Sequence, residues 1–193
     1  MKAVCVFCGS STGKQEIYAE VAHQLGVGIA SRGMAIVYGG SRVGLMKVVA
    51  DACLEAGGRA YGVIPEDMKG RELAHEELTE LHIVRSMHER KALMADLSDG
   101  FIAMPGGLGT LEEFFEIYTW GQLGYHSKPY GLLNVANYFD PLIGFLDHAV
   151  EEGFVRREHR ALLQISESPT RLLDLLEEFT PRPVSKWGGG ETR

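Results

Sequence analysis

The sequence is poor in cysteine and contains no long apolar run, and each lack excludes a class of protein. Three cysteines among 193 residues are too few, and odd in number, for a disulfide-stapled scaffold. No apolar run approaches the roughly 20 residues that a membrane-spanning helix needs. Residues 1–7 enter a strand-like pattern at once and lack the layout of a signal peptide. We therefore expect a cytoplasmic protein that has no membrane partner.

Basic residues are also scarce, and this argues against nucleic acid as a partner. The chain has 19 Lys and Arg against 26 Asp and Glu, which gives a formal net charge of −7. Nucleic-acid backbones are bound by clustered Lys and Arg, and no such stripe is present. One small phosphorylated ligand needs only a local pocket, so the charge does not exclude a nucleotide.

Cys5 and Cys8 form a C-x-x-C motif, for which redox chemistry and burial in a strand are the two interpretations. A redox pair is typical of a helix N-terminus, whereas Cys5 lies inside the apolar run of residues 3–7. No second cysteine pair completes a zinc site, and no His, Cys and Asp cluster has ligand spacing. The pattern favours buried cysteines, and we expect neither a metal nor a cofactor.

What the sequence does contain is a regular alternation of short apolar runs with longer amphipathic stretches. The apolar runs predict strands over residues 3–7, 34–38, 59–64, 81–84, 100–104, 130–134 and 162–165. The amphipathic stretches predict helices over residues 15–32, 45–56, 87–98, 111–123, 141–152 and 170–179. The fold class predicted is α/β: a Rossmann-like, doubly wound, mostly parallel sheet with helices on both faces.

No linker divides this alternating pattern, so residues 1–180 are expected to form a single domain. Residues 181–193 contain two prolines and three consecutive glycines, and they predict a disordered tail.

Three of the loops at the carboxyl ends of the predicted strands are rich in glycine. In a doubly wound sheet the ligand lies beyond these ends. The loops read CGSS at residues 8–11, YGGSRVGLM at 38–46 and PGGLGT at 105–110. Glycines at a strand-to-helix turn present backbone N–H groups at the positive end of a helix, a geometry that suits a phosphate.

Two familiar nucleotide motifs are absent. Residues 9–14, GSSTGK, are one residue too short for a Walker loop, and Gln15 replaces the Ser or Thr that would hold magnesium. No predicted strand leads into G-x-G-x-x-G, so dinucleotide binding of that type has no support. The sequence is not that of an obvious ATPase or dehydrogenase.

Charged residues near these loops are candidates for chemistry, and each has a structural alternative. Thr110 and Glu113 form a T-x-x-E pattern, which is either a helix-capping box or a carboxylate at the border of the phosphate site. The place of Glu113, one turn into the helix that would hold the phosphate, favours the second interpretation. Residues 87–91, MHERK, are either a solvated helix face or part of the same site. Glu72, by its local pattern alone, is a loop carboxylate.

The combined motifs resemble those of a known enzyme family. Residues 105–113 match PGGxGTxxE, and residues 87–91 are similar to the segment MHxRK. Together they resemble the Lonely Guy (LOG) family of cytokinin riboside 5′-monophosphate phosphoribohydrolases, whose members have often been labelled lysine decarboxylases. The resemblance covers residues 6–134, with FCGSS at 7–11, Thr119-Trp120 and GLLN at 131–134. It implies an N-glycosyl hydrolase, similar to AMP nucleosidase, that splits an adenosine 5′-monophosphate, N6-modified or not, into free base and ribose 5-phosphate.

The resemblance also implies a homodimer and a role for particular residues. Arg90 and Glu113 match the family's catalytic arginine and glutamate. The substrate-binding positions that it implies are Glu72, Lys91, Gly106, Gly107, Gly109, Thr110 and Thr119. The sequence departs from the family at Ser41 and Lys47, where glycines are usual, and we expect altered loop detail rather than loss of activity.

The chemistry implied is charge stabilisation beside the ribose. Loss of the base builds positive charge on the sugar, which the Glu113 carboxylate would stabilise while it orients or deprotonates the attacking water. Arg90 would hold Glu113 in its ionised form and grip the phosphate or the ribose hydroxyls. Two alternatives remain: a pyridoxal-phosphate decarboxylase, for which only Lys91 is a candidate Schiff base, and a nucleotide-binding carrier or sensor without turnover.

Overall fold

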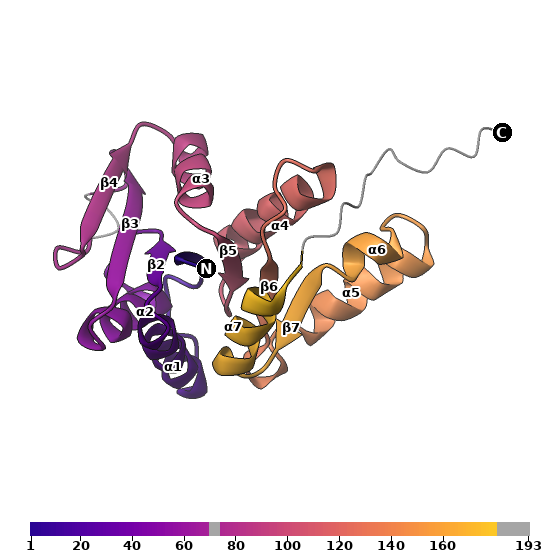
Figure 1. The fold of residues 1–193 in the computed structure, drawn as a ribbon, viewed down its shortest axis with the longest axis horizontal. Helices are drawn as coiled ribbons and strands as arrows, with labels where there is room; N and C mark the ends of the chain where they lie inside the picture. The colour runs from indigo at the N-terminus through magenta and orange to yellow at the C-terminus, as the bar shows by residue number, and fades with distance from the viewer. Residues whose placement is uncertain (70–73, 181–193) are drawn as a thin grey trace.

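The computed structural model describes residues 1–69 and 74–180, and its centre is one sheet of seven parallel strands. The strands lie in the order β4-β3-β2-β1-β5-β6-β7 (Figure 1). Their bounds are β1 Ala3–Phe7, β2 Ala35–Tyr38, β3 Arg59–Pro65, β4 Glu80–Val84, β5 Gly100–Ala103, β6 Tyr130–Leu133 and β7 Leu163–Ser166. The helices are α1 Ile17–Ser31, α2 Gly44–Glu55, α3 Met87–Asp96, α4 Leu108–Leu123, the 3-10 turn η1 Val135–Asn137, α5 Asp140–Glu151, α6 Arg157–Arg160 and α7 Pro169–Glu178.

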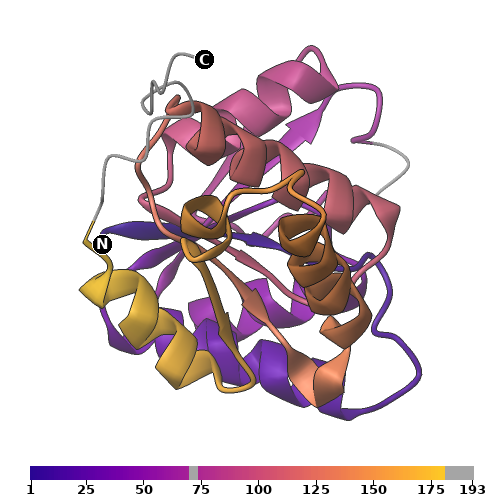
Figure 2. The same cartoon turned by 90° about the vertical axis from the view of Figure 1, so that its right-hand side faces the viewer.

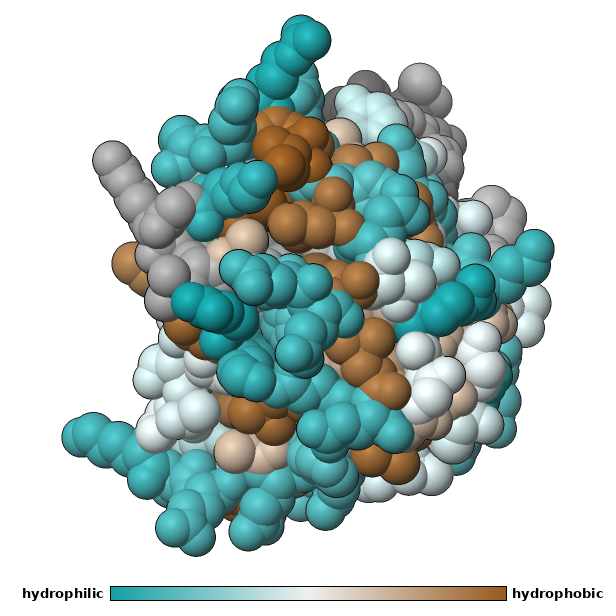
Figure 3. All heavy atoms as spheres, turned by 90° about the vertical axis from the view of Figure 1, so that its left-hand side faces the viewer, coloured by the Kyte–Doolittle hydropathy of each residue, from teal (hydrophilic) through white to brown (hydrophobic). Residues whose placement is uncertain are grey.

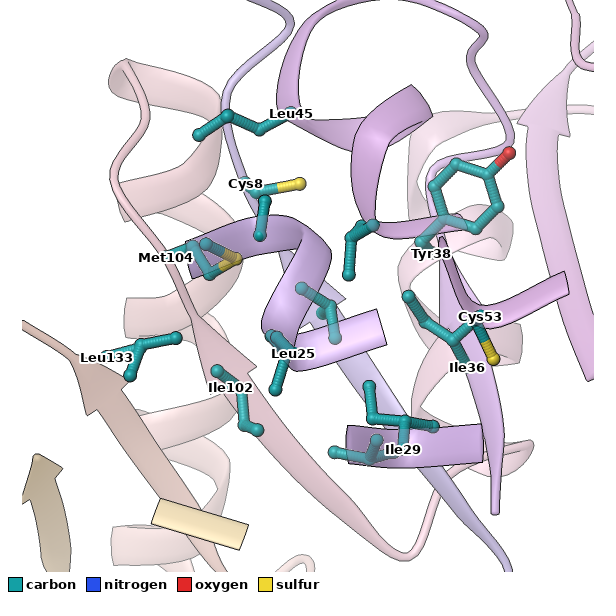
Figure 4. Close-up of a cluster of buried hydrophobic side chains, with 14 of the residues drawn as sticks. Cys8, Leu25, Ile29, Ile36, Tyr38, Leu45, Cys53, Ile102, Met104 and Leu133 are labelled. Atoms are coloured by element: carbon teal, nitrogen blue, oxygen red, sulfur yellow. The ribbon is translucent and has the colours of Figure 1, made fainter. Parts of the chain in front are cut away.

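Both faces of the sheet are covered by helices, which explains why the strands are apolar throughout. Helices α1, α2 and α7 cover one face, and α3, α4 and α5 cover the other (Figure 2). Alternate residues of β1 therefore enter two separate cores, because successive side chains of a strand point to opposite faces. Figure 4 shows the first core, where side chains of α1 and α2 pack on those of β2 and β5.

Cys5 and Cys8 lie in these two cores, which confirms that they are buried cysteines. Both thiols are free, and they belong to opposite faces of the sheet. Burial, with a smaller contribution from the charge of Glu113, raises the pKa of each thiol well above its usual value. A thiol with so high a pKa is a poor nucleophile.

The direction in which successive strands are added to the sheet reverses beside β1, and this reversal locates the site. From β1 the strands run outward to β4, and the chain then returns to form β5 on the other side of β1. In doubly wound sheets the crevice at such a switch point is the usual ligand site. The loops after β1 and β5 meet there: the Gly9 N–H donates to the Pro105 carbonyl over 3.1 Å.

The predicted fold is confirmed, with differences at the ends of its elements. The described sheet is parallel throughout rather than mostly parallel. The predicted helix over residues 111–123 begins three residues earlier, at Leu108, and the sequence did not indicate η1 or α6. The predicted tail lies outside the described residues, and the single domain over residues 1–180 stays a prediction.

The described residues on the side of the molecule that carries β4 show no continuous apolar patch (Figure 3). Hydrophobic side chains are interspersed there with hydrophilic ones (Figure 3). At this edge of the sheet Ile83 is exposed, but so is the charged Glu80 of the same strand, and charge on an edge strand discourages pairing with another chain. Within residues 1–69 and 74–180, no helix has the length and apolar character that crossing a membrane requires.

Candidate active site

A pocket of about 290 Å³ opens at the switch point, at the carboxyl ends of β1, β5 and β6. The loop after β1 supplies one wall, the loop after β5 supplies another, and Tyr138 comes from the connection after β6. The lining residues are Gly9, Ser10, Ser11, Thr12, Gly13, Tyr18, Leu45, Pro105, Gly106, Gly107 and Tyr138. All three glycine-rich loops therefore reach one pocket, the second through Leu45, as their positions in the sequence predict.

Gly106 is required where these loops touch. A Cβ at this position would lie 2.1 Å from the Thr110 hydroxyl oxygen and 2.8 Å from the backbone nitrogen of Gly9. Neither contact is tolerable, so no other residue fits without moving the loop. Gly107 and Gly109 lie differently, since a Cβ at either would meet nothing within 4 Å. These two glycines leave open space at the start of α4.

The N-terminus of α4 has no side-chain cap, which excludes the capping-box interpretation of the T-x-x-E pattern. The helix begins at Leu108, with Gly107 as its N-cap and no side-chain hydrogen bond to the cap. Thr110 is already helical and buried, so Thr110 and Glu113 do not form a capping box. The first N–H groups of a helix have no partner within it and carry the positive end of the dipole. The arrangement suits an anion such as a phosphate.

Arg90 is buried on α3, with its guanidinium fixed by two backbone carbonyls. Its Nε donates to the Val63 carbonyl over 3.0 Å, and its Nη2 donates to the Gly39 carbonyl over 3.1 Å. A Cβ at Gly39 would lie 2.1 Å from that Nη2, so the glycine makes room for the arginine. The guanidinium thus joins α3 to the carboxyl ends of β2 and β3.

Glu113 lies across from this guanidinium. Its Oε1 is 4.0 Å from Nη1 of Arg90, and the two side chains are 15% and 6% exposed. A separation of 4.0 Å is at the limit of an ion pair, so the two groups face each other at a distance too long for a hydrogen bond between these two atoms. The charge of Glu113 contributes, after burial, to the raised pKa of Cys8, the residue that follows β1. Neither residue of the pair lines the 290 Å³ pocket.

Lys91, the next residue on α3, is held by carboxylates of α4. Its Nζ lies 2.5 Å from Glu112 Oε1 and 3.0 Å from Glu116 Oε2. Burial alone would lower the pKa of Lys91, but the two carboxylates outweigh it, and the pKa is raised. A Schiff-base lysine needs a neutral amine, so this environment argues against a pyridoxal-phosphate decarboxylase.

Of the other predicted site residues, some lie together at the start of α4 and others do not. Gly106, Gly107, Gly109 and Thr110 lie together at the start of α4. Thr119 is exposed on the same helix, about 9 Å further along its axis than Glu113 and on a different face. The structure therefore does not bring Thr119 to Glu113 within one chain. Glu72 lies outside the described residues, and the roles of all these residues stay predictions.

Both departures from the family pattern belong to a network around the second glycine loop. Ser41 is fully buried and pairs with Ala74 in an isolated antiparallel bridge. Lys47 contacts Asp51, whose other carboxylate oxygen lies 2.7 Å from Nε2 of buried His75. The backbone N–H of His75 in turn donates to the carbonyl of Gly40, which belongs to the second glycine loop, over 3.0 Å. Sequence reasoning missed His75, because no local pattern pairs it with Asp51.

We expect Asp51→Asn to destabilise the fold by about 1 kcal/mol at pH 7, after allowance for partial solvent exposure. Burial raises the pKa of Asp51, but hydrogen bonds from Lys47 and His75 prevail, and the pKa is lowered overall. A lowered folded-state pKa gives stability that is present above the unfolded pKa of about 3.9 and is lost as the pH falls through the folded value.

Urea unfolding of both proteins from pH 7 down to pH 3 measures this effect. The difference in unfolding free energy between wild type and Asp51→Asn shrinks as the pH falls. A difference that stays constant, or grows in acid, contradicts the assignment.

Within residues 1–69 and 74–180, no three His, Cys, Asp or Glu side chains gather as a metal site would require. The fold and the site together define a doubly wound α/β protein that has an uncapped helix N-terminus at its switch point and an arginine–carboxylate pair between α3 and α4.

Comparisons with known proteins agree with this class and specify it. The family model described as possible lysine decarboxylase matches residues 46–176. A probable cytokinin riboside 5′-monophosphate phosphoribohydrolase of Oryza sativa subsp. japonica, LOGL2, is 49% identical over 94% of this chain and 74% of its own. The corresponding enzyme LOG1 of Arabidopsis thaliana is 46% identical over 94% of this chain and 85% of its own. The chain belongs to the family of cytokinin riboside 5′-monophosphate phosphoribohydrolases.

Solved structures agree on the fold alone. A molybdenum cofactor binding protein from Rippkaea orientalis superimposes with a TM-score of 0.70 and 22% identity, over 91% of this chain and 95% of that one. The molybdenum cofactor carrier protein of Chlamydomonas reinhardtii gives a TM-score of 0.68 and 20% identity, over 92% and 96%.

Proposed function

We propose that this protein hydrolyses the N-glycosidic bond of a cytokinin riboside 5′-monophosphate, releasing the free base and ribose 5-phosphate. The observation that carries the proposal is the Arg90–Glu113 pair near the uncapped N-terminus of α4. The relatives named above bear this activity in their names. Family membership supports the reaction, and the geometry supports the residues.

The N–H groups at the start of α4, from Gly107 to Thr110, bind the 5′-phosphate in this proposal. They combine unpaired donors with the positive end of the helix dipole. Ser10 and Ser11 line the same pocket and add hydroxyl donors. Anchoring the phosphate, which does not react, uses its binding energy to hold the ribose against the catalytic pair.

Glu113 stabilises the charge that develops as the bond breaks. The base leaves with the bonding electron pair, and positive charge spreads over C1′ and the ring oxygen of the ribose. The carboxylate opposes this charge, and a water molecule adds to C1′ while its proton passes to Glu113. The departing base takes up a proton from solvent, so the products are the neutral base and ribose 5-phosphate.

Arg90 holds the geometry of this pair. Because two carbonyls fix its Nε and Nη2, its Nη1 keeps one position opposite Glu113. The guanidinium orients the carboxylate and offers N–H donors to a ribose hydroxyl or the phosphate.

The experiment that tests the function follows free base by chromatography after incubation with N6-isopentenyl-AMP and, separately, with AMP. We expect base and ribose 5-phosphate in equal amounts from the N6-modified nucleotide, and we propose that AMP is cleaved as well. The ratio of the two rates identifies the preferred base. Nucleotide binding without release of base would instead favour the carrier or sensor.

We further propose that the enzyme works as a homodimer in the cytoplasm, with no nucleic-acid or membrane partner. Sedimentation velocity of the purified chain tests the dimer. Two observations support it. Leu108, Phe145 and Phe154 are large apolar side chains with 87%, 62% and 85% exposure. Thr119 is implied in nucleotide binding but points away from Glu113 in its own chain, so a second copy would have to bring it to a site.

A further inference from the structure

The connection between β6 and α5 contains two consecutive residues in the left-handed region. Ala136 has φ 49° and ψ 37°, and Asn137 has φ 59°. Asparagine tolerates this region, whereas alanine does so at a cost of about 1 kcal/mol or more. Strained residues of this kind persist only where the surrounding structure imposes them, and they are concentrated at functional sites.

The surroundings that impose this turn are visible on both sides of it. The buried side chain of Asn134 accepts a hydrogen bond from the Phe139 N–H over 2.7 Å and donates to the Asp140 carboxylate over 2.8 Å. Phe139 is itself buried in the core beneath α4 and α5. The ends of the turn are therefore fixed, and the residue before Phe139 has little freedom.

That residue is Tyr138, whose side chain reaches across to the loop after β5. Its hydroxyl donates to the carbonyl of Gly106 over 2.6 Å. Its ring meets the ring of Tyr18 edge-on, with centroids 5.9 Å apart and planes at 80°. Tyr138 lines the same pocket as Gly106 and Gly107 while it remains 42% exposed.

The contact with Gly106 has a consequence for the N-terminus of α4. The Gly106 carbonyl and the Gly107 N–H belong to one planar peptide unit, in which they point in opposite directions. A hydroxyl that holds the carbonyl therefore also fixes the direction of the first N–H of the uncapped helix. Gly106 has no Cβ to restrain its own rotation, so the restraint must come from outside.

We propose that Tyr138 is a positioning residue for the anion site, which orients the Gly106–Gly107 peptide toward the phosphate group of the ligand. The identity of the ligand as a nucleoside 5′-monophosphate rests on the proposed function. The restraint itself rests on the strained turn, on the two hydrogen bonds of the Asn134 side chain and on the 2.6 Å hydrogen bond from Tyr138 to Gly106.

The test is Tyr138→Phe, which removes one hydroxyl and keeps the ring against Tyr18. Tyr125→Phe is the matched control, since Tyr125 is exposed just beyond the other end of α4. Calorimetry measures the Kd of ribose 5-phosphate for each protein, and kinetics measures kcat and KM for N6-isopentenyl-AMP. Binding of N6-isopentenyladenosine, which lacks the phosphate, gives the third readout.

We expect Tyr138→Phe to weaken ribose 5-phosphate and raise KM by roughly 3- to 10-fold, the loss expected for one neutral hydrogen bond. We expect kcat within about twofold of wild type, and unchanged nucleoside binding and melting temperature. Equal weakening of nucleoside and nucleotide, or an unchanged Kd for ribose 5-phosphate, overturns the proposal, as does a wild type that does not bind ribose 5-phosphate. A wild-type protein that binds ribose 5-phosphate but releases no base refutes the proposed function. The role of Tyr138 is then decided by the ratio of the ribose 5-phosphate Kd values of Tyr138→Phe and wild type.

Discussion

Glu113→Gln is expected to lower kcat by at least about 100-fold, because it removes the negative charge that opposes the charge on the ribose. Deleting one electrostatic contact to a developing charge typically costs 10²- to 10³-fold in kcat. The amide keeps the size of the side chain and can still take part in hydrogen bonds, so the fold is expected to lose little. Release of base from N6-isopentenyl-AMP and the melting temperature, measured on the same preparation, report the two effects separately.

Glu112→Gln is the control for this prediction. Glu112 precedes Glu113 on α4, and its side chain is 56% exposed and paired with Lys91. Glu116 still holds Lys91 when Glu112 is neutral, so kcat is expected to stay within about threefold of wild type. A Glu113→Gln enzyme as fast as the Glu112→Gln enzyme would show that the charge of Glu113 has no part in catalysis.

The fold could be predicted because each strand is a short run of apolar residues between amphipathic stretches. Residues 101–104 show this well, because they are buried on both faces of the sheet. A strand of that kind is a continuous apolar run, which is easily recognised in the sequence. The repeated β-then-α units and right-handed crossovers predict a doubly wound parallel sheet, but they do not give the order of its strands. The ends of helices are less predictable, since they depend on a few hydrogen bonds.

Two helix starts illustrate the point. The T-x-x-E pattern of Thr110 and Glu113 resembles a capping box, yet α4 begins before it without a side-chain cap. A side-chain cap does exist at the start of α3, where the Ser86 hydroxyl accepts from the Glu89 N–H over 3.2 Å. The glutamate of this S-x-x-E pattern is part of the MHERK segment, where it is easily taken for one charge of a solvated face.

The candidate site could be predicted only where a motif carries its own geometry. The glycines of PGGLGT indicate a close approach of backbone, and Gly106 makes that approach. Tyr138 carries no such signal. Its contact with Gly106 joins two loops 32 residues apart and depends on a left-handed turn at Ala136, a conformation that alanine does not suggest.

Arg90→Met is expected to reduce kcat by about 100-fold or more and, unlike Glu113→Gln, to destabilise the fold. Methionine fills much of the volume of the arginine stem but donates no hydrogen bond. The carbonyls of Val63 and Gly39 then lose their buried donors, at about 1–3 kcal/mol for each. For a chain of 193 residues, such a loss lowers the melting temperature by several degrees, since 1 kcal/mol corresponds to about 2–4 °C.

Arg90→Lys separates the two roles of the arginine. Lysine keeps the charge near Glu113 but has one nitrogen, which cannot reach two carbonyls and the carboxylate together. We expect it to recover part of the lost stability, while kcat stays at least about tenfold below wild type because the guanidinium geometry is missing. Rates are compared at a temperature where all three proteins are folded, as circular dichroism shows. If Arg90→Met folds and releases base at the wild-type rate, Arg90 only joins α3 to the sheet, and the proposed catalytic pair reduces to Glu113 alone.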